Sequence, residues 1–350
     1  MGLFPRDRDL SRAPRQVALE VRACDFRVAP VDVAVRLDAF LKLRLPWRSR
    51  ASVQRLIHDG FVRVAPAGPG LERAPGDGDV ERRAARVLKH GARVIVLIPP
   101  ESQLPEVLAD PDGLVVLHED EEALVVDKPA GQAVHPSGRH LAGTLIQTVH
   151  ARYSQGGLLP VPIRLCHRID RETSGVVLLA KGERAHRNIR KQFERHGIEK
   201  EYLAVVHGSP VEDAGTIELP LGPAHGSRVR MKIAVREGGA EARTLWRVLE
   251  RRAALALVAC TLVTGRQHQI RVHLSAIGHP IVGDKLYGGD EELFLRNARR
   301  ELDARDHEEL RIERQALHSH RIAWHSPATH ERREVTSSLP GELRALLDGG

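Results

Sequence analysis

The chain has 350 residues, of which 42% are hydrophobic and only 3% aromatic, and its formal net charge is +7. This length predicts two domains, and the positive charge indicates an anionic partner, with nucleic acid the first candidate. The three cysteines are scattered and lack metal-ligand spacing, which argues against disulfides and zinc and predicts a reducing cytoplasm. No apolar run approaches the roughly 18 residues of a membrane span, so we expect a cytoplasmic protein without a membrane partner. The cysteine spacing leads us to expect no metal either.

The N-terminal part of the chain predicts a small accessory module. Residues 1–30 are a basic lead-in, and residues 31–100 form a compact unit. Apolar spacing within this unit predicts a helix over residues 36–45, a second helix with Ser49 as its N-cap, and a closing strand over residues 93–98. Two helices and a small sheet bury little apolar surface, which is typical of an accessory domain.

Basic and short polar side chains gather where the two predicted helices meet. They are Arg36, Lys42, Arg44, Arg48, Ser49, Arg50, Gln54 and Arg55. Guanidinium groups beside short polar groups at a helix N-terminus suit phosphate contacts. An ordinary solvated face is the alternative, although such a face usually mixes signs and this one carries few acidic residues. The pattern resembles the S-four type of RNA-binding domain, and the resemblance implies that these eight residues contact RNA.

A larger domain follows a linker. Residues 101–113 are rich in Pro, Asp and Glu, as linkers are, and residues 114–350 form the second domain. It opens with two short strands around an acidic turn, and the second strand ends at Lys128 in a Lys-Pro-Ala-Gly segment. Lys128 is a candidate phosphate contact, but on chemistry alone this is a strand that ends in a turn. The highly charged residues 290–315 predict a helical insertion.

The centre of the chain holds a carboxylate next to a buried strand. The five apolar residues 176–180 are too short for a helix and rich in branched side chains, which predicts a core strand. Asp170 lies on the loop that leads into this strand, a rigid mount for a reactive group. The alternative is a turn residue, or an ion pair with Arg168 or Arg171.

Two further segments carry candidate site residues. A strand over residues 198–206 places Tyr202 and Lys200 on one face by period-two alternation, although a half-buried tyrosine is usually a core residue. Downstream, an apolar helical stripe leaves Arg271 at the border of the buried face, where a guanidinium requires a carboxylate partner. Asp170 is the obvious candidate for that partner.

Two histidines in this downstream segment raise the question of a metal site. His268 and His273 flank Arg271. They are five residues apart and therefore point to different faces of the predicted helix, which argues against metal binding.

Taken in order, these segments resemble the RluA-type pseudouridine synthases. The stretch His167-Arg168-Ile169-Asp170-Arg171-Glu172-Thr173-Ser174-Gly175 is similar to the family signature, with Ile169 in place of the usual Leu. The Lys-Pro-x-Gly, Lys-x-Tyr and Thr-Gly-Arg-x-His-Gln-Ile-Arg-Val-His motifs of the family also have counterparts, and the resemblance extends over residues 36–324. It implies an α+β fold, with the small RNA-binding domain followed by a mixed, largely antiparallel sheet flanked by helices.

The resemblance also implies the roles of individual residues. Asp170 would be the catalytic carboxylate, Tyr202 would lie against the target base, and Arg271 would contact Asp170. Four more residues of the second domain would bind the RNA substrate, and Arg168 among them would fill the position that the target base vacates. They are Lys128, His167, Arg168 and Arg266.

The implied function is isomerisation of uridine to pseudouridine in RNA without a cofactor, by a protein that we expect to be a monomer. An RNA-binding module of this type favours large-subunit ribosomal RNA as the substrate. Two alternatives stay open: the same reaction on transfer RNA, and a non-catalytic RNA-binding or ribosome-assembly factor.

Overall fold

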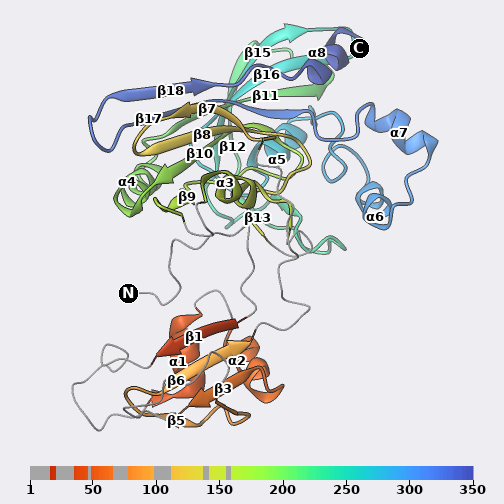
Figure 1. Ribbon diagram of the computed structural model, residues 1–350. Helices are drawn as coiled ribbons and strands as arrows, with labels where there is room; N and C mark the ends of the chain where they lie inside the picture. The colour runs from red at the N-terminus through yellow and green to blue at the C-terminus, as the bar shows by residue number, and fades with distance from the viewer. Residues whose placement is uncertain are drawn as a thin grey trace. The chain divides into compact units, whose positions relative to one another are not determined.

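The structure is a computed structural model that describes residues 16–20, 35–45, 49–65, 78–97, 112–136, 142–154 and 159–349. The chain separates into two compact units (Figure 1). One comprises Met1–Val107 with Ser154–Leu159, and the other comprises Leu108–Tyr153 with Pro160–Gly350.

The first unit packs two helices against a four-stranded sheet. The sheet has the order β1 (Gln16–Glu20), β6 (Arg93–Leu97), β3 (Val62–Ala65) and β4 (Asp79–Val80), and β2 (Val35–Arg36) pairs separately with β5 (Val87–Leu88). All five residues of β1 pair with β6. Residues predicted as a lead-in therefore supply a strand of this unit, while the predicted linker lies largely outside the described residues.

Both predicted helices of the first unit are present. They are α1 (Leu37–Arg44) and α2 (Arg50–His58). Ser49 caps α2 as predicted, since its Oγ accepts a hydrogen bond from the backbone N of Ser52 at 3.1 Å. Apolar residues of both helices, including Phe40 and Ile57, are fully buried in one cluster with the sheet.

The second unit is built on a ten-stranded sheet. The order is β12 (Ala214–Glu218), β15 (Arg243–Arg251), β16 (Leu255–Leu262), β11 (Glu199–His207), β17 (Leu317–His325), β10 (Ser174–Lys181), β8 (Ala123–Lys128) and β7 (Val115–Glu119), with β18 (Arg332–Thr336) on β17 and β9 (Ile163–Leu165) on β10. Every pair is antiparallel except β10 with β17. The predicted mixed, largely antiparallel sheet is therefore confirmed.

The second unit has six helices in its described residues (Figure 1). They are α3 (Leu145–Tyr153), α4 (Glu183–Glu194), α5 (Gln269–Ala276), α6 (Glu291–Arg299), α7 (Ala304–Leu310) and α8 (Gly341–Asp348), and β13 (Leu221–Pro223) pairs with β14 (Ile233–Val235) as a separate ribbon. Of the six helices, α3, α4, α5 and α8 contact strands of the sheet, whereas α6 and α7 lie to one side of it. The helices α6 and α7 confirm the helical character predicted for residues 290–315. No helix in the described part of the chain is long and apolar enough to cross a membrane.

Strand β10 is buried along almost its whole length, as its apolar run predicted. Val176, Leu178 and Ala180 pack in one cluster with Ala185 and Ile189 of α4. Burying a branched aliphatic side chain contributes about 1.5–3 kcal/mol, so this cluster fixes the strand firmly. The loop that carries Asp170 is thereby attached to a strand that is packed into the core.

The parallel contact between β10 and β17 is short and requires a glycine. Gly175 lies opposite Ser319 and has a φ of +107°, and a Cβ on Gly175 would lie 2.2 Å from the Ser319 carbonyl oxygen. Ser319 also lies opposite Tyr202 of β11. The Thr-Ser-Gly turn after Asp170 thus brings three strands to one level, and this places the Asp170 loop near Tyr202.

Candidate active site

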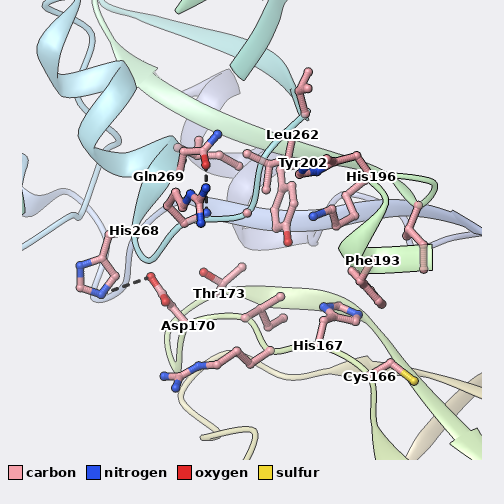
Figure 2. Close-up of a pocket in the computed structure, with 18 of the residues that line it drawn as sticks. Cys166, His167, Asp170, Thr173, Phe193, His196, Tyr202, Leu262, His268 and Gln269 are labelled. Carbon is pink, nitrogen blue, oxygen red and sulfur yellow. Dashed lines mark hydrogen bonds and ion pairs between the residues drawn. The ribbon is translucent and has the colours of Figure 1, made fainter. Parts of the chain in front are cut away.

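A cavity of about 720 Å³ lies between the Asp170 loop, α4, β11 and the start of α5. Asp170, Tyr202 and Arg271, which are far apart in the sequence, all line it. In Figure 2, Asp170 lies beside His268, and the Tyr202 hydroxyl points into the space between Asp170 and Phe193. The three residues predicted to form a catalytic site therefore do lie together.

Arg271 joins two carboxylates. Its Nη1 donates a hydrogen bond to Asp170 Oδ2 at 2.8 Å, as predicted. Its Nε and Nη2 donate to the two oxygens of Asp284, at 2.6 and 2.8 Å. Asp284 is only 1% exposed, and its Oδ1 also accepts from the backbone N of Leu286 and of Tyr287. The guanidinium is therefore held in one plane before any substrate arrives.

Asp284 was not among the predicted site residues. The residue lies 13 positions after Arg271, on a segment whose chemistry gave no reason for a role. The buried arginine was assigned a single carboxylate, although a guanidinium has five N–H donors and can serve two acids.

The arrangement keeps Asp170 ionised. Burial alone would raise the pKa of Asp170, but the positive charge of Arg271 and its hydrogen bond outweigh burial and hold this pKa below its ordinary value. Burial would lower the pKa of Arg271, but the two carboxylates, Asp284 first, raise it. Asp170 is 27% exposed at the side chain, so a charged carboxylate faces the cavity.

His268 completes the surroundings of Asp170. It precedes α5 in the left-handed conformation, with a φ of +56°. Its Nδ1 is 2.8 Å from the Tyr287 hydroxyl, and its Nε2 is 3.9 Å from Asp170 Oδ2. Burial lowers the pKa of His268 to about 4, so the imidazole is neutral at pH 7. It contributes shape and polarity to the site rather than a charge.

Tyr202 presents a neutral phenol to the cavity. The side chain is buried, and burial raises its pKa to about 12 despite an opposing hydrogen bond with Ser319. A phenol with this pKa stays protonated at pH 7 and acts as a hydrogen-bond donor with an apolar ring. The pocket environment predicted for Tyr202 agrees with this placement.

The four predicted RNA contacts of the second unit fall into two kinds. Arg168 and Arg266 are exposed and line the cavity. His167 also lines it, but its Nε2 accepts a hydrogen bond from the backbone N of Leu178, and burial lowers its pKa to about 3. This imidazole is a neutral tie to β10.

Lys128 was assigned wrongly as a phosphate contact. Its side chain is fully buried, and Nζ donates to the carbonyl oxygens of Pro129, Gln132 and Arg171 at 2.6, 2.8 and 3.0 Å. A side chain enclosed in this way reaches no RNA. It instead clamps the Lys-Pro-Ala-Gly turn to the loop that follows Asp170.

A buried acid, Asp38, orients part of the predicted RNA face of the first unit, and it was not among the predicted site residues. Asp38 is fully buried at its side chain and accepts hydrogen bonds from Arg36, Arg50 and Gln54. The Arg36 guanidinium holds the pKa of Asp38 down, at about 2. Arg36 and Arg50 remain largely exposed, so their guanidinium groups are oriented by Asp38 and still face solvent.

The remaining residues of that predicted face differ in their exposure. Arg55 is exposed and Lys42 is half-buried. Arg44 is buried and its guanidinium lies 5.5 Å from the centre of the Phe40 ring, so its placement as a surface contact was wrong. Ser49 is occupied as the α2 cap, and Arg48 lies outside the described residues.

The site offers no metal-binding cluster. No group of three or more His, Cys, Asp and Glu side chains with suitable spacing occurs among the residues that the structure describes. His273 uses both ring nitrogens inside the fold, with Thr244 Oγ1 at 2.9 Å and the Leu219 carbonyl oxygen at 3.0 Å.

Comparison with known proteins agrees with this geometry. Residues 122–276, which include all three candidate catalytic residues, match the family described as RNA pseudouridylate synthase. An uncharacterised RNA pseudouridine synthase of Chloroflexus aurantiacus is 37% identical over 323 residues, which cover 91% of this chain and 91% of that protein. The ribosomal large subunit pseudouridine synthase D of Pseudomonas aeruginosa is 35% identical over 319 residues, covering 89% and 91%.

A solved structure shows the same relationship. Human RNA pseudouridylate synthase domain containing 4 superimposes with a TM-score of 0.53 at 26% identity, covering 67% of this chain and 92% of that one. The chain thus belongs to the RNA pseudouridylate synthase family, and it is an RNA pseudouridine synthase, an isomerase.

Proposed function

We propose that this enzyme isomerises uridines of large-subunit ribosomal RNA, with Asp170 as its catalytic carboxylate. Support for the substrate comes from relatives named for the large ribosomal subunit, which match about nine tenths of the chain. Support for the residue comes from one observation above the others: an Asp170 carboxylate that faces a cavity while Arg271 binds it at 2.8 Å.

The reaction requires what Asp170 offers. Conversion of uridine to pseudouridine breaks the nitrogen–carbon glycosidic bond, turns the uracil and joins it again through a ring carbon. The carboxylate attacks either the anomeric carbon of the sugar or the uracil ring, and both routes require the ionised form. Arg271 maintains that form and fixes the direction of attack, and Asp284 fixes Arg271.

Tyr202 and the enclosing walls hold the detached base. The neutral phenol donates a hydrogen bond to a uracil oxygen, and its ring packs on the base. A base within a helix must leave its stack to enter the cavity, at a cost of a few kcal/mol. Arg168, exposed at the cavity two residues before Asp170, fills the vacated position and offsets part of that cost.

The first unit contributes RNA affinity in this proposal. Arg36 and Arg50, oriented by the buried Asp38, contact backbone phosphates, and Arg55 extends the same surface. We further propose that the enzyme acts as a monomer in the cytoplasm.

A tritium-release assay with purified protein tests this proposal. Joining the sugar to uracil C5 displaces the hydrogen there, so transcripts labelled with tritium at C5 report turnover directly. We expect release from large-subunit ribosomal RNA with wild-type protein and none with Asp170→Asn, while both proteins fold and bind the transcript.

Three other results would contradict parts of the proposal. Tritium release from transfer RNA alone would make transfer RNA the substrate in place of ribosomal RNA. Turnover by Asp170→Asn would remove the residue assignment, and RNA binding without release by wild type would leave the RNA-binding factor as the better account.

A further inference from the structure

Lys200 lies in the same cavity as Tyr202, and neither the proposed chemistry nor the proposed RNA contacts involve it. Both residues line the cavity from β11, where they are two positions apart and on one face of the strand. Two residues of a strand span about 7 Å, so Lys200 approaches the cavity roughly that far from Tyr202. This is the scale on which a nucleotide extends from its base to its phosphate.

Lys200 has no carboxylate partner within the described part of the chain. Burial lowers the pKa of Lys200. The acids that line the cavity are engaged elsewhere: Asp170 binds Arg271, and Glu194 pairs with Arg190 at 3.4 Å. A half-buried ammonium without a counter-ion is costly, and this cost is relieved when a ligand supplies the anion.

The ammonium group is held in place. Lys200 Nζ lies 5.5 Å from the centre of the Phe193 ring, whose centre is also 5.3 Å from that of the His167 imidazole. On another side, a Cβ built on Gly265 would lie 3.2 Å from Nζ, so the glycine leaves the room that the ammonium occupies. Lys200 is thus positioned by packing rather than by an ion pair.

The surroundings favour an anion. Arg168, Arg190 and Arg266 line the same cavity, so its rim is basic. In Figure 2, Phe193 and His196 lie on the opposite side of Tyr202 from Asp170. The cavity therefore has a carboxylate at one end and, at the end marked by Phe193, an ammonium that lacks a counter-ion.

We propose that Lys200 binds a backbone phosphate of the RNA, that of the target nucleotide or of its immediate neighbour, while the base lies between Tyr202 and Asp170. This inference rests on the proposed function, because it assumes that a nucleotide enters this cavity. It assigns Lys200 as a positioning residue: it fixes the sugar-phosphate and leaves the chemistry to Asp170.

The test compares Lys200→Met, which keeps packing on Phe193 but removes the charge, with Lys200→Arg, which keeps the charge. Lys191→Gln is the matched control, because Lys191 is exposed on α4, does not line the cavity and carries the same charge. The probe is a transcript of large-subunit ribosomal RNA, assayed for tritium release and, in the Asp170→Asn background, for binding across a salt series.

We expect Lys200→Met to raise KM about tenfold with kcat within about threefold of wild type, as loss of one charged hydrogen bond predicts. The slope of log affinity against log salt should fall by about 0.7, the value for one phosphate of a single strand. Lys200→Arg should restore most of the affinity, and Lys191→Gln should change KM and the slope much less.

Three results would overturn the assignment: a salt slope unchanged in Lys200→Met, equal effects of Lys200→Met and Lys191→Gln, or a fall in kcat with KM unchanged. If wild-type protein released no tritium, the proposed function itself would fail. The role of Lys200 is judged separately, from the binding series.

Discussion

Asp284 accepts hydrogen bonds from both Nε and Nη2 of Arg271, and this leaves Nη1 as the donor that reaches Asp170. The buried acid thus determines which edge of the guanidinium faces the cavity. Asp284 does not line the cavity, yet through Arg271 it controls the orientation of Asp170, the carboxylate that we propose reacts with the substrate.

Asp284→Asn should reduce kcat by at least about tenfold and destabilise the protein by about 3 kcal/mol, since one partner of a buried ion pair is lost. The measurements are tritium release and thermal unfolding. Asp306→Asn is a suitable control, because it removes a buried carboxylate from a pair with the half-exposed Arg296, and neither residue lines the cavity. If both variants lost stability equally and kept full kcat, Asp284 would have only a structural role.

The pH dependence of kcat/KM should reveal the influence of Arg271 on Asp170. The folded-state pKa of Asp170 lies below its ordinary value of 3.8, so the wild type should keep its activity down to about pH 5. In Arg271→Gln, burial acts without the opposing charge, and the acidic limb should move up by at least about one pH unit.

The same shift determines how the pair contributes to stability. The pair stabilises the wild type above the unfolded pKa of Asp170, and that stabilisation is lost as the pH falls through the folded pKa. If the acidic limb of the kcat/KM profile did not move in Arg271→Gln, the proposed effect of Arg271 on the pKa of Asp170 would be contradicted. Arg247→Gln, which breaks an exposed pair with Glu201, should leave the limb where it is.

Gly175→Ala should destabilise the protein severely and abolish activity. The added Cβ would lie 2.2 Å from the Ser319 carbonyl oxygen, so β10 and β17 must separate. Gly182→Ala is the matched control, because Gly182 also has a positive φ, +87°, so that a Cβ strains the backbone by about 1–3 kcal/mol, but this Cβ meets nothing within 4 Å. Similar melting temperatures for the two variants would show that the contact between β10 and β17 tolerates the methyl group.

Lys128→Met should lower stability without changing KM. The substitution removes the Lys128 donor from three carbonyl oxygens, at about 1–3 kcal/mol for each that stays buried without another donor. The Arg171 oxygen keeps the backbone N of Gly131 as a donor at 2.8 Å. Lys181→Met, which breaks a pair with Glu119 near the surface, should cost less than about 1 kcal/mol. A raised KM in a stable Lys128→Met protein would return Lys128 to the RNA-contacting residues.

The predictions that succeeded rest on local pattern. The apolar run after Asp170 predicted β10, the Ser49 cap predicted α2, and alternation along β11 placed Tyr202 and Lys200 on one face. Arg271 was paired with Asp170 by asking which acid a half-buried guanidinium requires. Each of these inferences needed only the chain near the residue and one chemical rule, with the family resemblance to assign the role.

The predictions that failed concern which residues meet across the fold. The burial of Lys128 depends on the loop at Arg171, 43 positions away, and that of Arg44 depends on how α1 packs on the sheet. Periodicity assigns a side chain to a face, but it does not say what covers that face. The pairing of Asp284 with Arg271 was missed for the same reason, because the fold brings two acids to one arginine.

In the proposed mechanism, Asp170 carries out uridine isomerisation in large-subunit ribosomal RNA. A pseudouridine map of ribosomal and transfer RNA from cells that lack this protein, complemented with wild type or Asp170→Asn, tests it most directly. We predict that sites in large-subunit ribosomal RNA disappear in the deletion and return with wild type alone. Sites restored equally by Asp170→Asn, or a map that does not change on deletion, would contradict this mechanism.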